Sequence, residues 1–301
     1  MITLMNRNKI LILGGRGYVG SFLAKHLQAH TVIPFGDRQH DLKNIDLDWL
    51  RHFEYVILLA GHSSVQSCLG PLKSPWLNNV SNFKWLLKHT LPSQKIIYAS
   101  SASVYGNKNV RVSVEDDLSL DYINNYDLTK TTLDLFALQQ ISLGRQLIGL
   151  RFGTVNGGSS TIRRDLMINS MVYSALNDGK IFVSNKQVSR PILYINDLCR
   201  AIQAILESQK GFVPGIYNLA SFNSTVELMA REASLQTKTD IIDLGDKDGV
   251  YNFSISPDKF SYTYNFQFTG TPELVVNSVI NCYKFQQPNV VVRNEYFEYH
   301  G

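Results

Sequence analysis

The sequence contains few residues that crosslink or stiffen a chain. Its 301 residues include only three cysteines and nine prolines. The cysteines, Cys68, Cys199 and Cys282, are odd in number and show no paired spacing, which excludes a disulfide framework and a zinc knuckle. A chain of this length can bury a core large enough to fold without such crosslinks. We therefore expect no metal site and a reducing compartment.

Strong charge and long apolar runs are also absent. The formal net charge is +4 and the basic residues are scattered, so nucleic acid is not an expected partner. The longest apolar runs, such as residues 55–60, have the length of a strand and fall far short of a membrane span. The first nine residues lack the apolar region of a signal peptide. These absences predict a cytoplasmic protein without a membrane partner.

Short apolar runs alternate with segments of helical periodicity in the first half of the chain. Runs without polar alternation, at residues 10–13, 55–60 and 95–99, are typical of parallel strands buried on both faces. Strands separated by helices predict an α/β fold with a Rossmann-type doubly wound parallel sheet. The run at 32–35 contains Pro34, which places that strand at an edge or a bulge.

A glycine-rich loop joins the first predicted strand to the first predicted helix. Gly14 permits the tight turn, Gly17 lets the backbone approach a pyrophosphate, and Gly20 lets the helix pack on the strand. The helix N-terminus behind the loop offers free N–H groups to the phosphates. In this strand-loop-helix context the glycines predict a bound dinucleotide.

The residues after the second strand bear on the choice of dinucleotide. Asp37 favours the free 2′-hydroxyl of NAD, whereas Arg38 favours the 2′-phosphate of NADP. Arg16, in the glycine loop, is a second arginine within reach of a 2′-phosphate. We predict NAD and keep NADP as the alternative.

The second half of the chain is less regular. A strand is predicted at 147–152 and helical stripes at 167–176 and 198–205. No linker rich in Gly, Ser or Pro separates the halves, so a second domain would pack closely on the first. We predict a dinucleotide-binding domain at 1–155 and a smaller, mainly substrate-binding domain at 156–301, with some segments returning to the Rossmann sheet.

A serine-rich strand end is followed by a tyrosine and a lysine four residues apart. Ser101 lies at the end of a predicted strand, and carboxyl ends of parallel strands are where open α/β sheets bind ligands. Tyr126 and Lys130 share one face of a helix. An ammonium beside a phenol favours the phenolate, so Lys130 should lower the pKa of Tyr126. The phenolate would then accept a hydroxyl proton at neutral pH.

Together these motifs resemble the extended short-chain dehydrogenase/reductases, in the NAD-dependent epimerase/dehydratase branch that acts on nucleotide sugars. The resemblance covers residues 9–285 and rests on the motifs at 14–20, 59–61, 100–106 and 126–130. It implies that Ser101 orients the substrate hydroxyl, that Tyr126 is the acid/base, and that Lys130 holds the nicotinamide ribose. It also implies that Asp41 and Leu42 contact the adenine. The full set of implied cofactor contacts is Gly14, Arg16, Gly17, Tyr18, Val19, Gly20, Asp37, Arg38, Asp41, Leu42, Leu59, Ala60, Gly61, Ala99, Tyr126 and Lys130.

The resemblance also implies a nucleotide-diphosphate sugar as substrate. Arg190 matches the position that binds the diphosphate, a task that suits the paired donors of a guanidinium. Asn169 matches a nucleotide contact, and Thr154 stands where the family usually has asparagine. A further arginine, usual near 246–252, is missing, and Lys247 or Tyr251 is expected to replace it. With Ser101 and Ser103, these residues (Thr154, Asn169 and Arg190) form the expected substrate site.

Departures from the family pattern narrow the expected reaction. Sugar dehydratases carry an acid pair where Ala102 and Ser103 stand, and 3,5-epimerising enzymes typically carry a cysteine at the position of Ser103. What remains is redox at one ring carbinol, most simply carbon 4, with epimerisation, net oxidation or net reduction as the outcome. A lipid or aromatic ketone reductase and a non-catalytic dinucleotide-sensing protein stay as alternatives. A homodimer is compatible with each.

Overall fold

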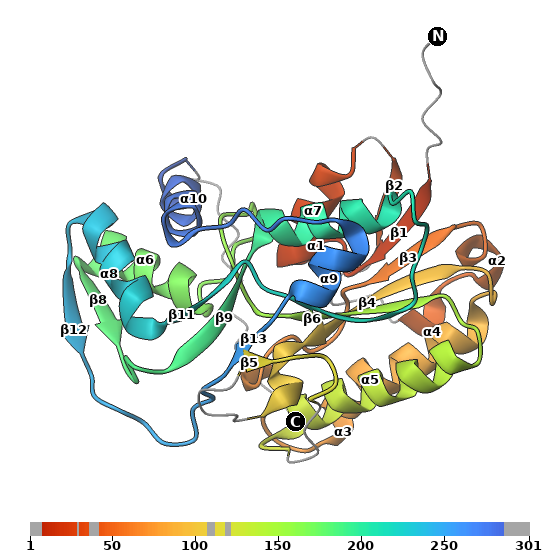
Figure 1. The fold of residues 1–301 in the computed structure, drawn as a ribbon, viewed down its shortest axis with the longest axis horizontal. Helices are drawn as coiled ribbons and strands as arrows, with labels where there is room; N and C mark the ends of the chain where they lie inside the picture. The colour runs from red at the N-terminus through yellow and green to blue at the C-terminus, as the bar shows by residue number, and fades with distance from the viewer. Residues whose placement is uncertain (1–7, 29, 36–41, 107–111, 118–121, 286–301) are drawn as a thin grey trace, which may run out of the picture.

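The centre of the molecule is a six-stranded parallel sheet (Figure 1). The computed structural model describes residues 8–28, 30–35, 42–106, 112–117 and 122–285. The order across the sheet is β10-β6-β4-β3-β1-β2, and every neighbouring pair is parallel. The strands are β1 (Lys9–Leu13), β2 (Thr31–Phe35), β3 (Tyr55–Leu58), β4 (Lys95–Ser101), β6 (Leu147–Phe152) and β10 (Gly215–Leu219). The predicted α/β fold is confirmed.

The strands are continuous apolar runs because both faces of the sheet are covered. Along β1, Ile10 and Ile12 join one core cluster, while Leu11 and Leu13 join another on the opposite face. Helices α1 (Tyr18–His26), α7 (Ile195–Leu206) and α9 (Asp258–Tyr264) cover the first face, and α4 (Asn82–His89) and α5 (Asn125–Ser142) cover the second (Figure 1). The covering on both faces is what a doubly wound sheet requires.

Strand β2 forms one edge of this sheet within the described residues. Pro34 pairs in register with Ile12 of β1 and has no N–H to give to a further neighbour. The edge position predicted for this proline strand is therefore confirmed.

A smaller unit lies beside the sheet, at the left of Figure 1. Its core is built from α6 (Met167–Asp178), α8 (Val226–Thr237), α10 (Pro272–Phe285) and β8 (Lys180–Val183), with residues such as Val172, Met229 and Val276 fully buried. Strands β7 (Thr154–Asn156), β9 (Ser189–Tyr194) and β11 (Phe222–Thr225) form a second sheet, and β12 (Asp240–Asp243) pairs with β8. The domain boundary at residue 155 stays a prediction, although α7 and β10 do pack with the central sheet.

Short elements complete the described part of the chain. They are η1 (Leu42–Asn44), α2 (Leu47–Leu50), η2 (Gln66–Cys68), α3 (Lys73–Pro75), the π-helix η3 (Trp76–Ser81), η4 (Ala102–Tyr105), β5 (Val112–Ser113) and β13 (Ser254–Ile255). Strand β1 lies between β2 and β3, so the chain order reverses there. Ligands of open α/β sheets bind outside the carboxyl ends at such a reversal.

Candidate active site

The glycine loop after β1 is shaped by close backbone contacts. A Cβ at Gly14 would lie 2.7 Å from the backbone nitrogen of Ala60, and Gly14 has φ of +84°. A Cβ at Gly20 would lie 2.3 Å from the carbonyl oxygen of Gly14. By contrast, a Cβ at Gly17 would meet one described atom within 4 Å, the Gly14 oxygen at 3.2 Å. Gly14 and Gly20 are therefore required by packing, while Gly17 leaves open space at the start of α1.

This open space has the properties of a phosphate cradle. Gly17 is the N-cap of α1 and gives the helix no side-chain cap. The N–H groups of the first turn are thus left for a ligand, as the N-terminus of a helix allows. The residues present fit the pyrophosphate of a dinucleotide on this geometry.

The other residues predicted to contact the cofactor lie around this cradle to different degrees. The backbone N–H of Leu59 donates to the carbonyl of Leu13 at 2.8 Å, which holds the end of β3 beside the loop. Leu42 is buried in the core, and Arg16 is exposed. Asp37, Arg38 and Asp41 lie outside the described residues, so the predicted discrimination between NAD and NADP and the acid of the adenine pair stay predictions.

Tyr18 and Asn169 bind helix α1 to the loop that follows β7. The Tyr18 hydroxyl donates to the carbonyl of Gly157 at 2.7 Å. The amide of Asn169 accepts from the Gly157 N–H at 3.2 Å and donates to the Tyr18 hydroxyl and to the carbonyl of Arg163. Asn169 is fully buried. A direct contact between Asn169 and a nucleotide, as predicted, would require its amide to leave these partners.

Ser101, Tyr126 and Lys130 converge at the carboxyl end of β4. Ser101 is the last residue of β4, and its hydroxyl donates to the Ser103 hydroxyl at 3.0 Å and lies close enough to Tyr126 to oppose the rise of the tyrosine pKa. The Lys130 Nζ donates to the carbonyl of Ala99 at 2.9 Å and lies 5.7 Å from the centroid of the Tyr126 ring. Helix α5 begins at Asn125, so Tyr126 and Lys130 stand on its first turns as the spacing predicts.

The pKa of Tyr126 differs in sign from the prediction. Burial raises it to about 12, and the pKa of Lys130 is lowered by burial to about 8. Desolvation of the phenol is the largest effect, the positive charge that opposes it is that of Arg163, and the Nζ of Lys130 is engaged by the carbonyl of Ala99. In this structure Tyr126 is a neutral phenol at pH 7.

Asn79 supports the acid/base helix from behind and is absent from the predicted site. It lies in the π-helix η3 and is buried. Its side-chain oxygen accepts from the N–H of His62 at 2.9 Å, and its nitrogen donates to the hydroxyl of Thr129 at 3.0 Å. Thr129 in turn donates to the carbonyl of Tyr126. Apolar periodicity predicts the helix around residue 80 but carries no signal for a π-turn, which often marks a functional site.

Arg163 is a second residue that the sequence analysis does not identify. Its guanidinium is almost entirely buried, pairs with Asp165, and donates to the hydroxyl of Ser63 at 2.8 Å. The contact joins the loop after β7 to the loop after β3. Burial raises the pKa of Tyr126, and the positive charge of Arg163 opposes that rise. Its position near Tyr126 depends on two loops that are remote in sequence.

Arg190 faces no carboxylate within the described residues. It lies in β9, beside β7, whose first residue is Thr154, and its Nη1 donates to the carbonyl of Ser189 at 3.0 Å. Burial lowers the pKa of Arg190 to about 10, and the proximity of Tyr251 opposes this shift. A half-buried guanidinium without an acidic partner is suited to an anionic ligand. Of the two residues expected to replace the missing arginine, Lys247 is exposed and Tyr251 approaches Arg190.

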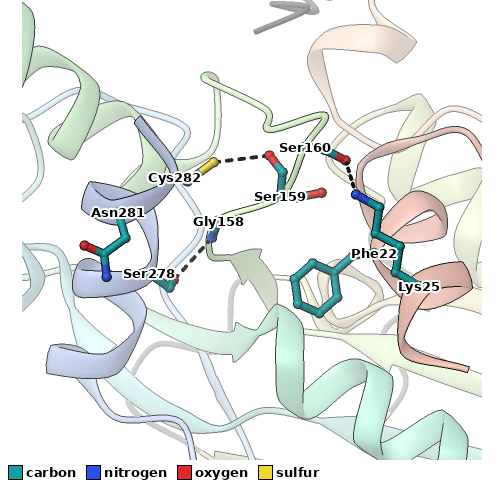
Figure 2. Close-up of a pocket in the computed structure, with 8 residues that line it drawn as sticks. All are labelled: Phe22, Lys25, Gly158, Ser159, Ser160, Ser278, Asn281 and Cys282. Carbon is teal, nitrogen blue, oxygen red and sulfur yellow. Dashed lines mark hydrogen bonds between the residues drawn. The ribbon is translucent and has the colours of Figure 1, made fainter. Parts of the chain in front are cut away.

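A cavity of about 380 Å³ lies away from these residues (Figure 2). Its lining comes from α1, α10 and the loop between β7 and α6, and consists of Phe22, Lys25, Gly158, Ser159, Ser160, Ser278, Asn281 and Cys282. Lys25 reaches toward Ser160 at 3.5 Å, and the Cys282 thiol toward the carbonyl of Ser159. None of the residues predicted for catalysis or binding lines this cavity. We therefore locate the candidate active site at the carboxyl ends of the strands and not in this cavity.

Two further features bear on the class of site. Over the described ranges, no cluster of three or more His, Cys, Asp or Glu side chains is arranged to hold a metal ion. In the same part of the chain, every helix is too short or too polar to cross a bilayer.

Comparison with known proteins shows which family this chain resembles. The model of the NAD dependent epimerase/dehydratase family matches residues 10–220. A Bacillus subtilis protein named "Uncharacterized UDP-glucose epimerase YtcB" is 29% identical over 234 residues, which cover 66% of this chain and 72% of that protein.

Solved structures share the fold at low sequence identity. UDP-glucuronic acid 4-epimerase from Bacillus cereus, in complex with UDP-glucuronic acid and NAD, superposes with a TM-score of 0.78 at 19% identity, covering 91% of this chain and 98% of that one. RMD from Pseudomonas aeruginosa, complexed with NADPH, has a TM-score of 0.78 at 19% identity, with 92% and 99% covered. The family match spans both the glycine loop and the strand end at Ser101, and the chain belongs to the NAD dependent epimerase/dehydratase family.

Proposed function

We propose that the protein is an NAD-dependent oxidoreductase of nucleotide-diphosphate sugars that acts at one ring carbinol, most simply carbon 4. The observation that carries this proposal is the convergence of Ser101, Tyr126 and Lys130 at the carboxyl end of β4. Family membership supports the same chemistry. Epimerisation, net oxidation and net reduction all use this arrangement.

Each residue of this site has a separate role in the oxidation of the carbinol. Tyr126 takes the proton of the substrate hydroxyl, while Ser101 hydrogen-bonds that hydroxyl and orients it. Lys130, anchored by the carbonyl of Ala99, holds the nicotinamide ribose. NAD, when bound, supplies the hydride acceptor and a positive charge that favours the phenolate of Tyr126. That charge would oppose the burial that raises the pKa of Tyr126.

The cofactor assignment rests on the glycine cradle and on the proteins that resemble this chain. One structural neighbour is complexed with NAD and another with NADPH. We propose NAD as the cofactor, with NADP as the alternative, held by the cradle at Gly14, Gly17 and Gly20.

Gly17→Val should abolish dinucleotide binding and leave the protein folded. The backbone of Gly17 is extended, with φ of −76°, which valine adopts readily, and the close contact of a Cβ with the Gly14 oxygen at 3.2 Å needs only a small local shift. The added side chain occupies the space in which the pyrophosphate lies. Binding of NAD(H) and NADP(H) is measured by titration, with circular dichroism to confirm folding and Gly17→Ala as a graded control. Undiminished affinity in folded Gly17→Val protein would refute the cradle.

The substrate assignment rests on Arg190. Its guanidinium is half-buried and has no carboxylate partner among the residues described, and the B. cereus neighbour binds a UDP-sugar. We propose that Arg190 binds the diphosphate, and that Thr154, Ser103 and Ser101 lie along the sugar. The same observation disfavours a lipid or aromatic ketone as substrate, because such a ligand would leave the charge of Arg190 uncompensated.

Arg190→Ala should weaken nucleoside diphosphate binding by about 10- to 150-fold, the range of a charge-assisted hydrogen bond. Affinity for NAD should stay unchanged. Arg190→Lys should recover only part of the loss, because a point charge does not reproduce a bidentate fork. Calorimetric titration with UDP and ADP measures the effect, and Arg231→Ala, on the exposed face of α8, is the matched control. Parent-like affinity in Arg190→Ala would move the ketone reductase to first place.

A further inference from the structure

Tyr251 connects the substrate-binding unit to the acid/base helix. It lies in the segment between β12 and β13, far in sequence from helix α5. Its hydroxyl donates to a carboxylate oxygen of Asp127 and accepts from the side-chain nitrogen of Asn124. Asp127 is the neighbour of Tyr126, and Asn124 is the N-cap of α5. The Tyr251 hydroxyl thereby holds the first turn of the helix that carries Tyr126.

The next residues of the same segment are hydrogen-bonded to the neighbour of Arg190. The side-chain oxygen of Asn252 accepts from the N–H of Ser189 at 2.9 Å, and Ser189 is the neighbour of Arg190. Phe253 makes a further backbone contact with Ser189. Adjacent residues, 251 and 252, therefore bind the neighbours of the acid/base residue and of the diphosphate-binding arginine.

Asp127 also lies close to Ser103 of turn η4. It is buried, one of its carboxylate oxygens accepts from Tyr251, and Ser103 lies close enough to lower its pKa, while burial raises that pKa overall. Ser103 in turn hydrogen-bonds Ser101 through its hydroxyl and its backbone N–H. Asp127, held by Tyr251, therefore lies beside the hydrogen-bonded pair of Ser103 and Ser101.

The packing of the Tyr251 ring and the protonation of its hydroxyl both suit a structural role. Its ring packs on the core around turn η4, which includes Ala102 and Val104, and stacks edge-on against Phe253 at 6.0 Å. Burial, reinforced by Asp127, raises the pKa of Tyr251 far above its ordinary value, so the hydroxyl stays a donor. Because one partner accepts from this hydroxyl and another donates to it, its hydrogen bonding is already used within the protein.

We propose that Tyr251 and Asp127 are positioning residues that hold the first turn of α5, and with it Tyr126, in register with a substrate bound at Arg190. The inference rests on the proposed function and deepens it: the phosphate-binding strand and the acid/base helix belong to different units, and this pair fixes their relative placement. Small errors in that placement lower the rate of reaction steeply, while the contacts that bind the nucleotide are unchanged.

Tyr251→Phe removes the hydroxyl and keeps the ring on turn η4. We expect the turnover number on a nucleotide sugar to fall by roughly 10- to 100-fold, as misplacement by a fraction of an ångström would cause. KM and the affinity for NAD should change less than about two-fold, because Arg190 and the glycine cradle are intact. Tyr262→Phe, at a tyrosine that is 85% exposed, is the matched control.

Asp127→Ala should produce the same loss, and the double variant should lose no more than either single variant, because both remove one connection. Asp127→Asn, which still accepts from Tyr251, should recover part of the turnover. Losses of turnover that add in the double variant would overturn the positioning role. So would variants that lose thermal stability but keep the parental turnover number.

Hydrogen exchange separates this inference from the proposed function. Without any substrate, Tyr251→Phe should speed amide exchange in residues 125–128 and 245–253 relative to the parent and to Tyr262→Phe. Unchanged exchange together with unchanged turnover would refute the pair while leaving the function in place. If the parent turns over no nucleotide sugar, the proposed function and the catalytic part of this inference both fail, and faster exchange would show only a structural connection.

Discussion

Tyr126→Phe should lower the turnover number on the true nucleotide sugar by about 10²- to 10⁴-fold, the usual worth of general acid/base catalysis. The substitution removes one oxygen from a buried ring and little volume, so stability should barely change. NAD should still bind, because Lys130 is anchored by Ala99 and the glycine cradle belongs to another segment of the chain. Steady-state kinetics and an NAD titration on the same preparation measure both quantities.

The control for this variant is a tyrosine four residues earlier. Tyr122 is 40% exposed, and Tyr122→Phe should retain parental turnover. If Tyr126→Phe worked at a near-parental rate, Tyr126 would not be the acid/base, and the convergence at the end of β4 would lose its catalytic meaning.

Asp134→Ala should reduce the free energy of unfolding by about 3–5 kcal/mol, which is the expected cost of leaving one partner of a buried ion pair alone. Asp134 lies on α5 one turn beyond Lys130, and it accepts from Arg151 Nε at 2.7 Å with both side chains buried. Tyr98 donates to its other oxygen at 3.0 Å. The substitution leaves the buried charge of Arg151, in β6 between β4 and β10, without its carboxylate partner. Urea unfolding measures the resulting loss of stability.

Leu135 supplies the comparison for this stability effect. It lies on the same helix and is 44% exposed, so Leu135→Ala should change the free energy of unfolding by less than about 1 kcal/mol. An Asp134→Ala protein as stable as Leu135→Ala would show that the pair with Arg151 is not a determinant of the fold.

The sheet was predictable because its strands are buried on both faces. The run at residues 147–152 coincides with β6, since parallel strands under two layers of helices read as unbroken apolar stretches. The predicted strand at 95–99 extends to Ser101 in the structure, because β4 continues beside β6 as far as Phe152. Polar residues at a strand end carry no periodic signal, so the apolar run stops two residues before the strand, although the sequence does place Ser101 at the strand end.

The site was predictable only where its residues are close in sequence. Tyr126 and Lys130 share one helix and a fixed spacing, which a sequence displays directly. Three separate segments contribute Asn79, Arg163 and Tyr251 to the surroundings of Tyr126. The contacts of these residues depend on the finished packing. The raised pKa of Tyr126 cannot be predicted from the sequence for the same reason, because burial of its hydroxyl is a property of the assembled structure.

Product analysis by NMR tests the central proposal most directly. The protein is incubated with NAD and a panel of nucleotide-diphosphate sugars, and the sugar ring signals are followed over time, with Tyr126→Phe in parallel. The proposed function predicts that one nucleotide sugar is changed at a single ring carbinol, either inverted or oxidised to the ketone, and that Tyr126→Phe leaves it unchanged on the same timescale. No change in any nucleotide sugar, with reduction of a lipid or aromatic ketone in the same assay, would contradict it.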